Sequence, residues 1–404
     1  MSSTTAKRRS FFRSPWVVPA AVSGAVAVAL VSQPLLATGD SNDLPDITAE
    51  QLIANVLDAE PQAMSGTVVH TARLGLPDML FTEATGADPI SLLGGSSTIR
   101  LWTDGEERSR VALLGTMSEY SVVANGPEMW TYSSAEDEAV RYSFSDADLA
   151  ELESMSEEAR AEMLDRKAEL PTPQEAAEQA LAMVNEFSTV EIDAQTTIAG
   201  RDVYQVIVTP TSDETLVERV ALAIDGETMI PLRVQTWSTQ DTSAPAVEVS
   251  FTDVDFGMPS ESVFDFSAPA SATERDVVIP LPEKDGTNKA TGEKHEMPVV
   301  TGEGWESVVE FKGMDFAALL SEDPASVTDA GGRIIGSDEA QKMLEEFMPE
   351  SDGMSLEMVE LYGQLTTEVP EGDLFSTALL NVLVTDDGRV LVGAISADAL
   401  RALA

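Results

Sequence analysis

The side chains that could carry chemistry in this chain are carboxylates, because the other reactive types are almost missing. The sequence has 70 Asp and Glu residues, two His and no Cys. Without Cys there is no disulfide, thiolate metal site, thiol nucleophile or lipid-modified N-terminal cysteine. His70 and His295 cannot build a multi-histidine metal site, and neither lies near a GxSxG nucleophile motif. Nothing pairs the acids with a base or nucleophile, so we expect no enzyme, catalytic residue, metal or cofactor.

The charge balance excludes other partners. The 404-residue chain has 24 Lys and Arg, so its formal net charge is -46. A surface this acidic repels phosphate backbones and anionic headgroups, so we expect no nucleic-acid partner. The acids show no calcium-loop spacing and are interpreted as solubilising surface.

The chemistry that remains is the burial of apolar surface. In residues 217–224, 230–238 and 246–256, apolar side chains alternate with smaller or polar ones; Leu222 and Ile224, for example, alternate with Ala221 and Ala223. This period is typical of an antiparallel sheet with one covered face. Burying one large side chain contributes ~1.5–3 kcal/mol, so something must cover this face. We therefore expect a protein that binds something apolar.

An aromatic hairpin is predicted at residues 125–142, NGPEMWTYSSAEDEAVRY. Trp130 and Tyr132 are two residues apart in its first strand, so they share one face. That face decides whether they line a pocket or only hold the sheet together. His70 lies inside another predicted strand, 65–74, where we expect a satisfied or solvent-facing histidine and not a ligand.

The elements that position these residues form a long meander interrupted by helices. A helix is predicted to begin after Thr48, which caps it with Gln51 at the third helical position and an Ile47–Leu52 staple. Residues 145–187 have helical spacing, and residues 75–96 read as a loop or short helices. That loop is either a lid over a cavity or a loop that packs its own side chains. The remaining strands are predicted at 97–103, 109–114, 119–124, 190–198 and 203–209.

Four segments follow from composition. Residues 1–39 are a signal peptide or N-terminal membrane anchor, with a basic start and an uncharged run over residues 16–36. This predicts an exported, extracytoplasmic protein of the cell envelope, or a secreted one. Residues 40–267 form the main domain and residues 268–298 a Pro-rich linker. Residues 299–404 form a small β-α domain, with strands at 304–311, 376–384 and 389–394, short helices at 315–320 and 338–347, and a final helix capped by Ser396.

The aromatic hairpin resembles a strand pair of the outer-membrane lipoprotein-carrier family (LolA-like), through Gly126, Trp130, Tyr132 and Val140. Residues 224–233, IDGETMIPLR, are similar to that family's strand, turn and Pro-Leu-Arg strand. The resemblance covers roughly residues 44–267. The overall plan looks like actinobacterial secreted members with a C-terminal extension, here the hairpin at residues 383–390. RseB-type regulators are similar in placing a small domain after such a fold.

The resemblance implies an α+β fold, a curved antiparallel half-barrel sheet whose concave apolar face is covered by helices, and acyl chains or other lipids as ligands. The carriers' Arg-Pro-x-x-Phe-Arg strand has no counterpart here, so no lid-latching arginine is carried over. The implied function is a monomeric lipid or lipoprotein carrier that binds a lipid or acylated protein. The alternative is an envelope-stress or signalling regulator that binds a membrane protein. The candidate cavity residues are Ile99, Leu101, Val111, Leu113, Trp130, Tyr132, Val206, Val208, Leu222, Ile224, Leu232, Val234, Val249 and Phe251.

Overall fold

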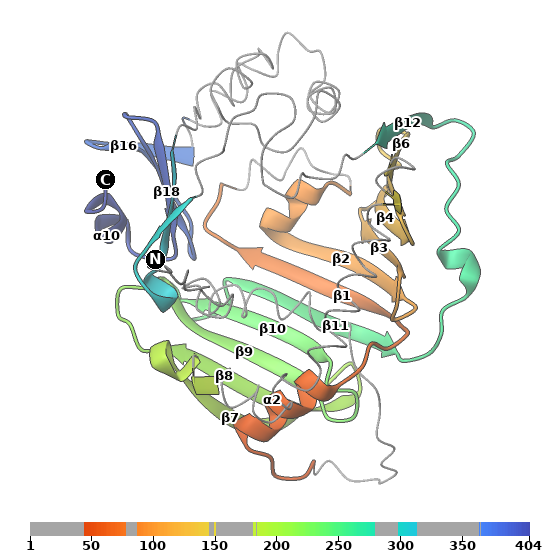
Figure 1. The fold of residues 1–404 in the computed structure, drawn as a ribbon, viewed down its shortest axis with the longest axis horizontal. Helices are drawn as coiled ribbons and strands as arrows, with labels where there is room; N and C mark the ends of the chain where they lie inside the picture. Colours follow the sequence, from red (N-terminus) through yellow and green to blue (C-terminus); the bar gives the residue numbers. More distant parts are fainter. Residues whose placement is uncertain are drawn as a thin grey trace, which may run out of the picture.

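One curved, mostly antiparallel sheet of twelve strands dominates the computed structural model (Figure 1). The structure describes residues 44–77, 87–144, 149–150, 181–182, 184–278, 298–312, 363 and 365–404. The predicted targeting segment, residues 1–39, lies outside this part of the chain, as do most of residues 145–187. Among the described residues, no helix is long and apolar enough to cross a bilayer.

The predicted meander is confirmed, with strand ends shifted by a few residues. The sheet order is β12-β6-β5-β4-β3-β2-β1-β11-β10-β9-β8-β7, so β1 joins two meanders, β2 to β6 and β7 to β11. The strands are β1 Met64–Arg73, β2 Gly94–Thr103, β3 Arg108–Leu114, β4 Glu119–Asn125, β5 Glu128–Ser133, β6 Glu138–Ser143, β7 Ser188–Ile198, β8 Arg201–Pro210, β9 Val217–Asp225, β10 Pro231–Ser238, β11 Val247–Asp255 and β12 Thr273–Val278. A short 3-10 helix, η2 Pro89–Leu93, precedes β2 within the predicted loop.

Strand β12 differs from the sequence prediction, which placed residues 273–278 in the linker. It pairs in parallel with β6, unlike the other neighbours in this sheet, which pair antiparallel. Its sequence, TERDVV, has no apolar alternation that would predict a strand. Charged side chains help to hold it against β6. Arg275 Nε lies 2.7 Å from a carboxylate oxygen of Glu138 on β6. The chain between β11 and β12, residues 256–272, crosses to this edge as a strap, which includes the 3-10 helix η3 Glu261–Val263.

The register fixes which side chains share a face, because directly opposite residues in a sheet point the same way. We call inner the face of the large sheet that contains one such row, and outer the opposite face. From β8 across to β2, this row is Val206, Leu222, Val234, Val249, His70 and Ser97. From β2 to β6, a second inner row is Leu101, Val111, Val122, Thr131 and Val140.

Helix α2, Ala49–Asp58, packs on the inner face at one end of the sheet, in front of β7 to β9 (Figure 1). The predicted capping box is confirmed, since Thr48 and Gln51 exchange side-chain and backbone hydrogen bonds. Leu52 is buried in a cluster with Tyr204 and Val206. Of the predicted helical excursion, residues 149–150, 181–182 and 184–187 are described and helical, and Phe187 packs on the same cluster.

The C-terminal part forms a second sheet of six strands in the order β13-β14-β18-β17-β16-β15. The predicted strand 376–384 instead begins at the last residue of β16, turns over residues 377–380, where Thr377 Oγ1 accepts the N–H groups of Leu379 and Leu380, and continues as β17. The predicted strand at 304–311 begins as the 3-10 helix η4 Gly304–Glu306. The final helix, capped by Ser396, is confirmed as α10 Ala397–Arg401. The strands are β13 Val299–Thr301, β14 Val308–Lys312, β15 Thr366–Val369, β16 Gly372–Ser376, β17 Asn381–Thr385 and β18 Arg389–Gly393.

Trp305 joins the two sheets. It is 5% exposed and belongs to the same buried cluster as Leu52 of α2. Its indole N–H donates a 2.7 Å hydrogen bond to Ser188 Oγ at the start of β7. The backbone adds a further link, because Leu216 N–H donates to the carbonyl of Ala394. The C-terminal unit therefore covers part of the inner face beside α2.

The turn between β9 and β10 explains why the IDGETMIPLR segment has a distinctive sequence. The carboxylate of Asp225, 1% exposed, accepts N–H groups of Glu227 and Thr228 inside the turn. Arg201, at the start of β8, donates to both oxygens of this carboxylate, at 2.5 and 2.9 Å. Removing one partner of such a buried charge pair costs about 3–5 kcal/mol. The segment therefore carries a structural lock.

Gly66 is required where β1 crosses the β-bulge of β11. A Cβ at this position would lie 2.7 Å from the carbonyl oxygen of Asp253 and 2.8 Å from the ring of Phe251. We predict that Gly66→Ala lowers the free energy of unfolding by about 1–3 kcal/mol in chemical denaturation. Gly257→Ala is the matched control, since its Cβ would meet mainly the movable carboxylate of Asp255. Equal stability of the two variants would contradict the close approach at Gly66.

The indole hydrogen bond of Trp305 gives a second test. We predict that Trp305→Phe destabilises the protein by about 1 kcal/mol in urea unfolding, because the bond to Ser188 is lost. Trp305→Ala should cost about 3–5 kcal/mol through the cavity that it creates. Trp237→Phe is the control, because the indole N–H of Trp237 is buried without a hydrogen-bond partner. An equal loss of stability in Trp237→Phe would contradict a stabilising role for the Trp305–Ser188 hydrogen bond.

Candidate functional site

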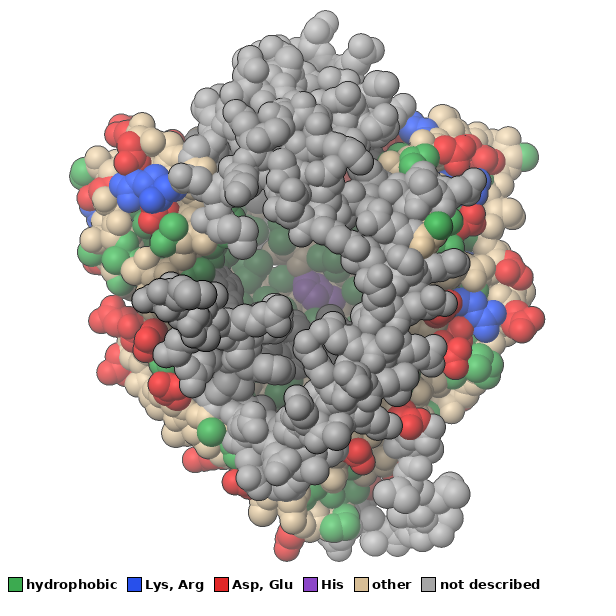
Figure 2. Space-filling view, in the orientation of Figure 1, with side chains coloured by type: hydrophobic (Ala, Val, Ile, Leu, Met, Phe, Trp, Pro, Cys, Tyr) green, Lys and Arg blue, Asp and Glu red, His purple; other side chains and the backbone are tan. Residues whose placement is uncertain are grey.

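The middle of the inner face is apolar and only partly covered. At the β8 and β9 end, Val206 and Val208 are buried beneath α2 and Trp305. Further along the sheet Val68 and Ala72 of β1 are buried, but several other inner side chains are half-buried, and Val111 on β3 is 37% exposed. Figure 2 shows a hollow in which hydrophobic side chains surround a histidine. The half-buried candidate residues of this region are Ile99, Leu101, Leu222, Val234, Val249 and Phe251.

Most of the predicted cavity residues share the inner face. Leu232 lies at a bulge of β10, between Pro231 and Arg233, and is buried in a cluster with Met64. The register brings together on the inner face Ile99, Leu101, Val111, Leu113, Val206, Val208, Leu222, Ile224, Val234, Val249 and Phe251. Their role in lipid binding remains a prediction.

Trp130 and Tyr132 lie on the outer face, apart from the other candidates. Their neighbour Thr131 is opposite Val122 and Val140 on the inner face, so the two aromatic side chains point the other way. There they pack against Phe266 of the strap, with ring centroids 5.4 and 5.8 Å away. The aromatic hairpin therefore anchors the strap and does not line the hollow.

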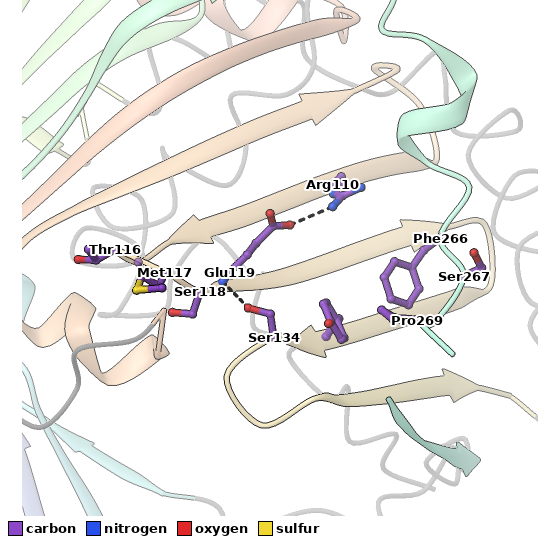
Figure 3. A pocket seen from close by; sticks show the side chains of 11 residues that line it. Arg110, Thr116, Met117, Ser118, Glu119, Ser134, Phe266, Ser267 and Pro269 are labelled. Carbon is purple, nitrogen blue, oxygen red and sulfur yellow. Dashed lines mark hydrogen bonds and ion pairs between the residues drawn. The ribbon is translucent and has the colours of Figure 1, made fainter. Parts of the chain in front are cut away.

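A separate pocket of about 540 Å³ opens on the outer side, between the strap and the strands β3 to β5 (Figure 3). Arg110 donates to Glu119 at 2.9 Å, and Ser134 Oγ accepts the backbone N–H of Glu119. Phe266 and Tyr132 supply its aromatic side. The ion pair satisfies the two central charges with each other, so the pocket offers no free charge to a ligand. The other lining residues are Gly115, Thr116, Met117, Ser118, Ser267 and Pro269.

His70 is a functional candidate that the sequence analysis underrated. Its side chain is half-buried on the inner face, directly opposite Val249 and Ser97. Its Nδ1 atom is buried without a hydrogen-bond partner, so the histidine is neither satisfied nor simply solvent-facing. The available signal was its period in β1, where it alternates in step with Val68 and Ala72.

The physical state of His70 follows from its surroundings. Burial lowers its pKa below the ordinary value of 6.5, because an apolar environment disfavours the charged ring. Its ring is therefore neutral at neutral pH. The described part of the chain contains no group of three His, Asp or Glu side chains placed to hold a metal ion.

The arginines of the large sheet lie mainly on the outer face, over aromatic rings. Arg219 lies 4.0 Å from the ring centroid of Trp237, and Arg100 lies 4.9 Å from that of Trp102. Arg219 on β9 and Arg100 on β2 each alternate with inner-face residues of their strand, so both side chains point to the outer face. The two faces therefore differ in kind, the outer one charged and aromatic, the inner one apolar.

No protein-family model matches the chain, and no curated protein matches it. Among solved structures, the chain is similar to MucB in complex with MucA(peri), at 14% identity and a TM-score of 0.38, covering 84% of this chain and 90% of that one. It is similar to the LolA superfamily protein NE2245 from Nitrosomonas europaea, at 11% identity and a TM-score of 0.20, covering 55% and 99%. It is also similar to LprF from Mycobacterium bovis, at 11% identity and a TM-score of 0.26, covering 57% of this chain and 100% of that one. A LolA superfamily protein is thus among the structural neighbours, as is MucB.

The histidine titration can be measured directly. We predict that His70 titrates below 6.5 in the folded protein, whereas the unfolded chain titrates near 6.5. As pH falls, the unfolded state therefore binds the proton at a higher pH than the folded state does. This histidine thus lowers the free energy of unfolding as pH falls through the pKa of the unfolded chain. NMR of the imidazole signals, with a His295→Gln variant to assign them, measures the pKa. A value at or above 6.5 for His70 would contradict the desolvated setting.

Proposed function

We propose that this protein is an extracytoplasmic lipid-binding protein that buries an acyl chain against the middle of its inner face. One observation carries the proposal, the apolar inner-face surface that runs across β10, β11, β1, β2 and β3, on which Val234, Val249, Phe251, Ile99 and Leu101 are half-buried and Val111 is exposed. Monomeric soluble proteins rarely leave a contiguous apolar surface open unless it is a binding site. The basic N-terminus followed by an uncharged run supports export from the cytoplasm.

The dimensions suit an acyl chain. Neighbouring strands lie about 4.8 Å apart, so five adjacent strands span roughly 19 Å from first to last. Each methylene removed from water contributes ~0.8 kcal/mol. About ten methylenes therefore supply roughly 8 kcal/mol, which corresponds to a Kd near 1 μM before the costs of binding are counted. Binding of this kind needs no catalytic residue, and we propose none.

A second candidate is a regulator that binds a membrane protein through its C-terminal unit. The observation in its favour is that β13 and β15 form the two edges of the smaller described sheet. Edge strands offer unpaired backbone groups to a partner strand. Deleting residues 299–404 is a poor test, because Trp305 would leave the buried cluster on the large sheet. Point substitutions on β15, such as Thr367→Pro, test this candidate with less damage.

We predict that Val249→Asp weakens binding of a fluorescent fatty acid at least tenfold, because it places a charge in the middle of the apolar surface. Ser250→Asp is the matched control, since the next residue on β11 faces the outer side, opposite Arg233. Titration of the purified full chain, with mass spectrometry of co-purified lipid, measures the effect. Val249→Phe, which fills the hollow without a charge, should also weaken binding. It serves as the test if the Asp variant folds poorly.

The outcomes separate the candidates. Uptake by the wild type and the Ser250 variant, with loss in both Val249 variants, supports the lipid site. Absence of lipid and of probe uptake in the wild type would sink the proposal. Equal losses at positions 249 and 250 would mean that the probe does not occupy the inner face.

A further inference from the structure

His70 is a titratable side chain in the centre of the largely apolar inner surface. Its inner-face neighbours along β1 are Val68 and Ala72, and Val249 and Ser97 lie directly opposite. Ser97 does not serve as its partner, because the Ser97 hydroxyl lies within hydrogen-bonding distance of Ser91. The further inner-face residues around it on the described strands are uncharged: Gly95, Ile99, Val247 and Phe251. The adjacent 3-10 helix η2, PISLL, has no titratable side chain.

The unpaired Nδ1 determines where the ring proton lies. A buried N–H without an acceptor is rarer in proteins than an acceptor that is under-used. The neutral ring therefore carries its proton on Nε2 and leaves the lone pair on Nδ1. Nε2 is at the far end of the ring from the backbone, and Figure 2 shows a histidine side chain at the floor of the hollow. Among the described residues, His70 has no hydrogen-bond partner, so this N–H is available to a ligand.

We propose that His70 donates a hydrogen bond from Nε2 to the carbonyl oxygen of an esterified acyl chain and so selects neutral acyl esters. This inference rests on the proposed lipid site. A single donor in an apolar surface fixes the position of one polar group, while the hydrocarbon supplies affinity.

The ester is favoured over a free fatty acid by charge. A carboxylate buried here would have no cation among the described inner-face residues around His70, and the chain carries a net charge of -46. Burying a charge without a partner is far more costly than burying a carbonyl that accepts one hydrogen bond. Burial also keeps the pKa of His70 low, so near pH 8 the ring is neutral and cannot neutralise the carboxylate.

The test is displacement of a fluorescent apolar dye from the full chain by methyl laurate, laurate and dodecane at pH 8. We expect wild type to bind methyl laurate more tightly than laurate. His70→Leu should weaken methyl laurate about three- to tenfold, the effect of one lost hydrogen bond, and leave dodecane unchanged or tighter. His70→Gln, which keeps a donor, should restore part of the loss. His295→Leu is the control substitution of the other histidine.

Each result decides the matter. Selective loss of methyl laurate in His70→Leu, with rescue by Gln, establishes the proposal. Equal changes for methyl laurate and dodecane would overturn it and leave the lipid site standing. Preference of the wild type for laurate, lost in His70→Leu, would overturn the choice of a neutral ester. Failure of all three ligands to displace the dye would overturn the lipid site itself.

Discussion

The structure depends on the pairing of β1 with β11, because this contact turns two separate meanders into one sheet. β1 comes from the start of the described chain and β11 from nearly two hundred residues later. Side chains alternate with a period of two, so a slip of one residue would move every inner side chain to the outer face. A bulge at Thr67 and Val68 sets the register, and Gly66 allows the strands to approach. The apolar rows of β8 to β11 continue into β2 and β3 only because this register holds.

The second constraint is that the inner face is longer than what covers it among the described residues. Helix α2 and Trp305 cover the β8 and β9 end, where burial is nearly complete. On β2, further along the face, Ile99 and Leu101 stay half-buried. Packed cores leave few voids, so a partly open apolar face is unusual for a structure that only has to be stable. The uneven coverage links the packing to the proposed binding of an acyl chain.

On the outer face, arginine side chains cover aromatic rings. Arg108 lies 5.1 Å from the ring centroid of Phe264, which is 1% exposed, and Arg110 pairs with Glu119. Aromatic rings covered by guanidinium groups stay largely out of water while the surface remains charged. The strap adds Phe264 and Phe266 to this layer and then places β12 along the edge strand β6. The positive groups of the large sheet are thereby used on the side away from the hollow.

Local signals predicted the strands β1 to β11, the capping box of α2 and most of the inner-face residues, because each depends on a few neighbouring residues. The face of Trp130 and Tyr132 could not be predicted in this way. It follows from the registers of β3, β4 and β5 in sequence, and β4 itself is apolar on both sides, with Val122 inward and Val123 outward. A strand with apolar residues on both faces implies that each face is covered. Here the outer cover is the strap. Its Pro-containing and acidic sequence has no strand or helix period from which its position could be predicted. The pattern of β4 therefore carried the information that a second layer exists, although not the identity of the segment that forms it.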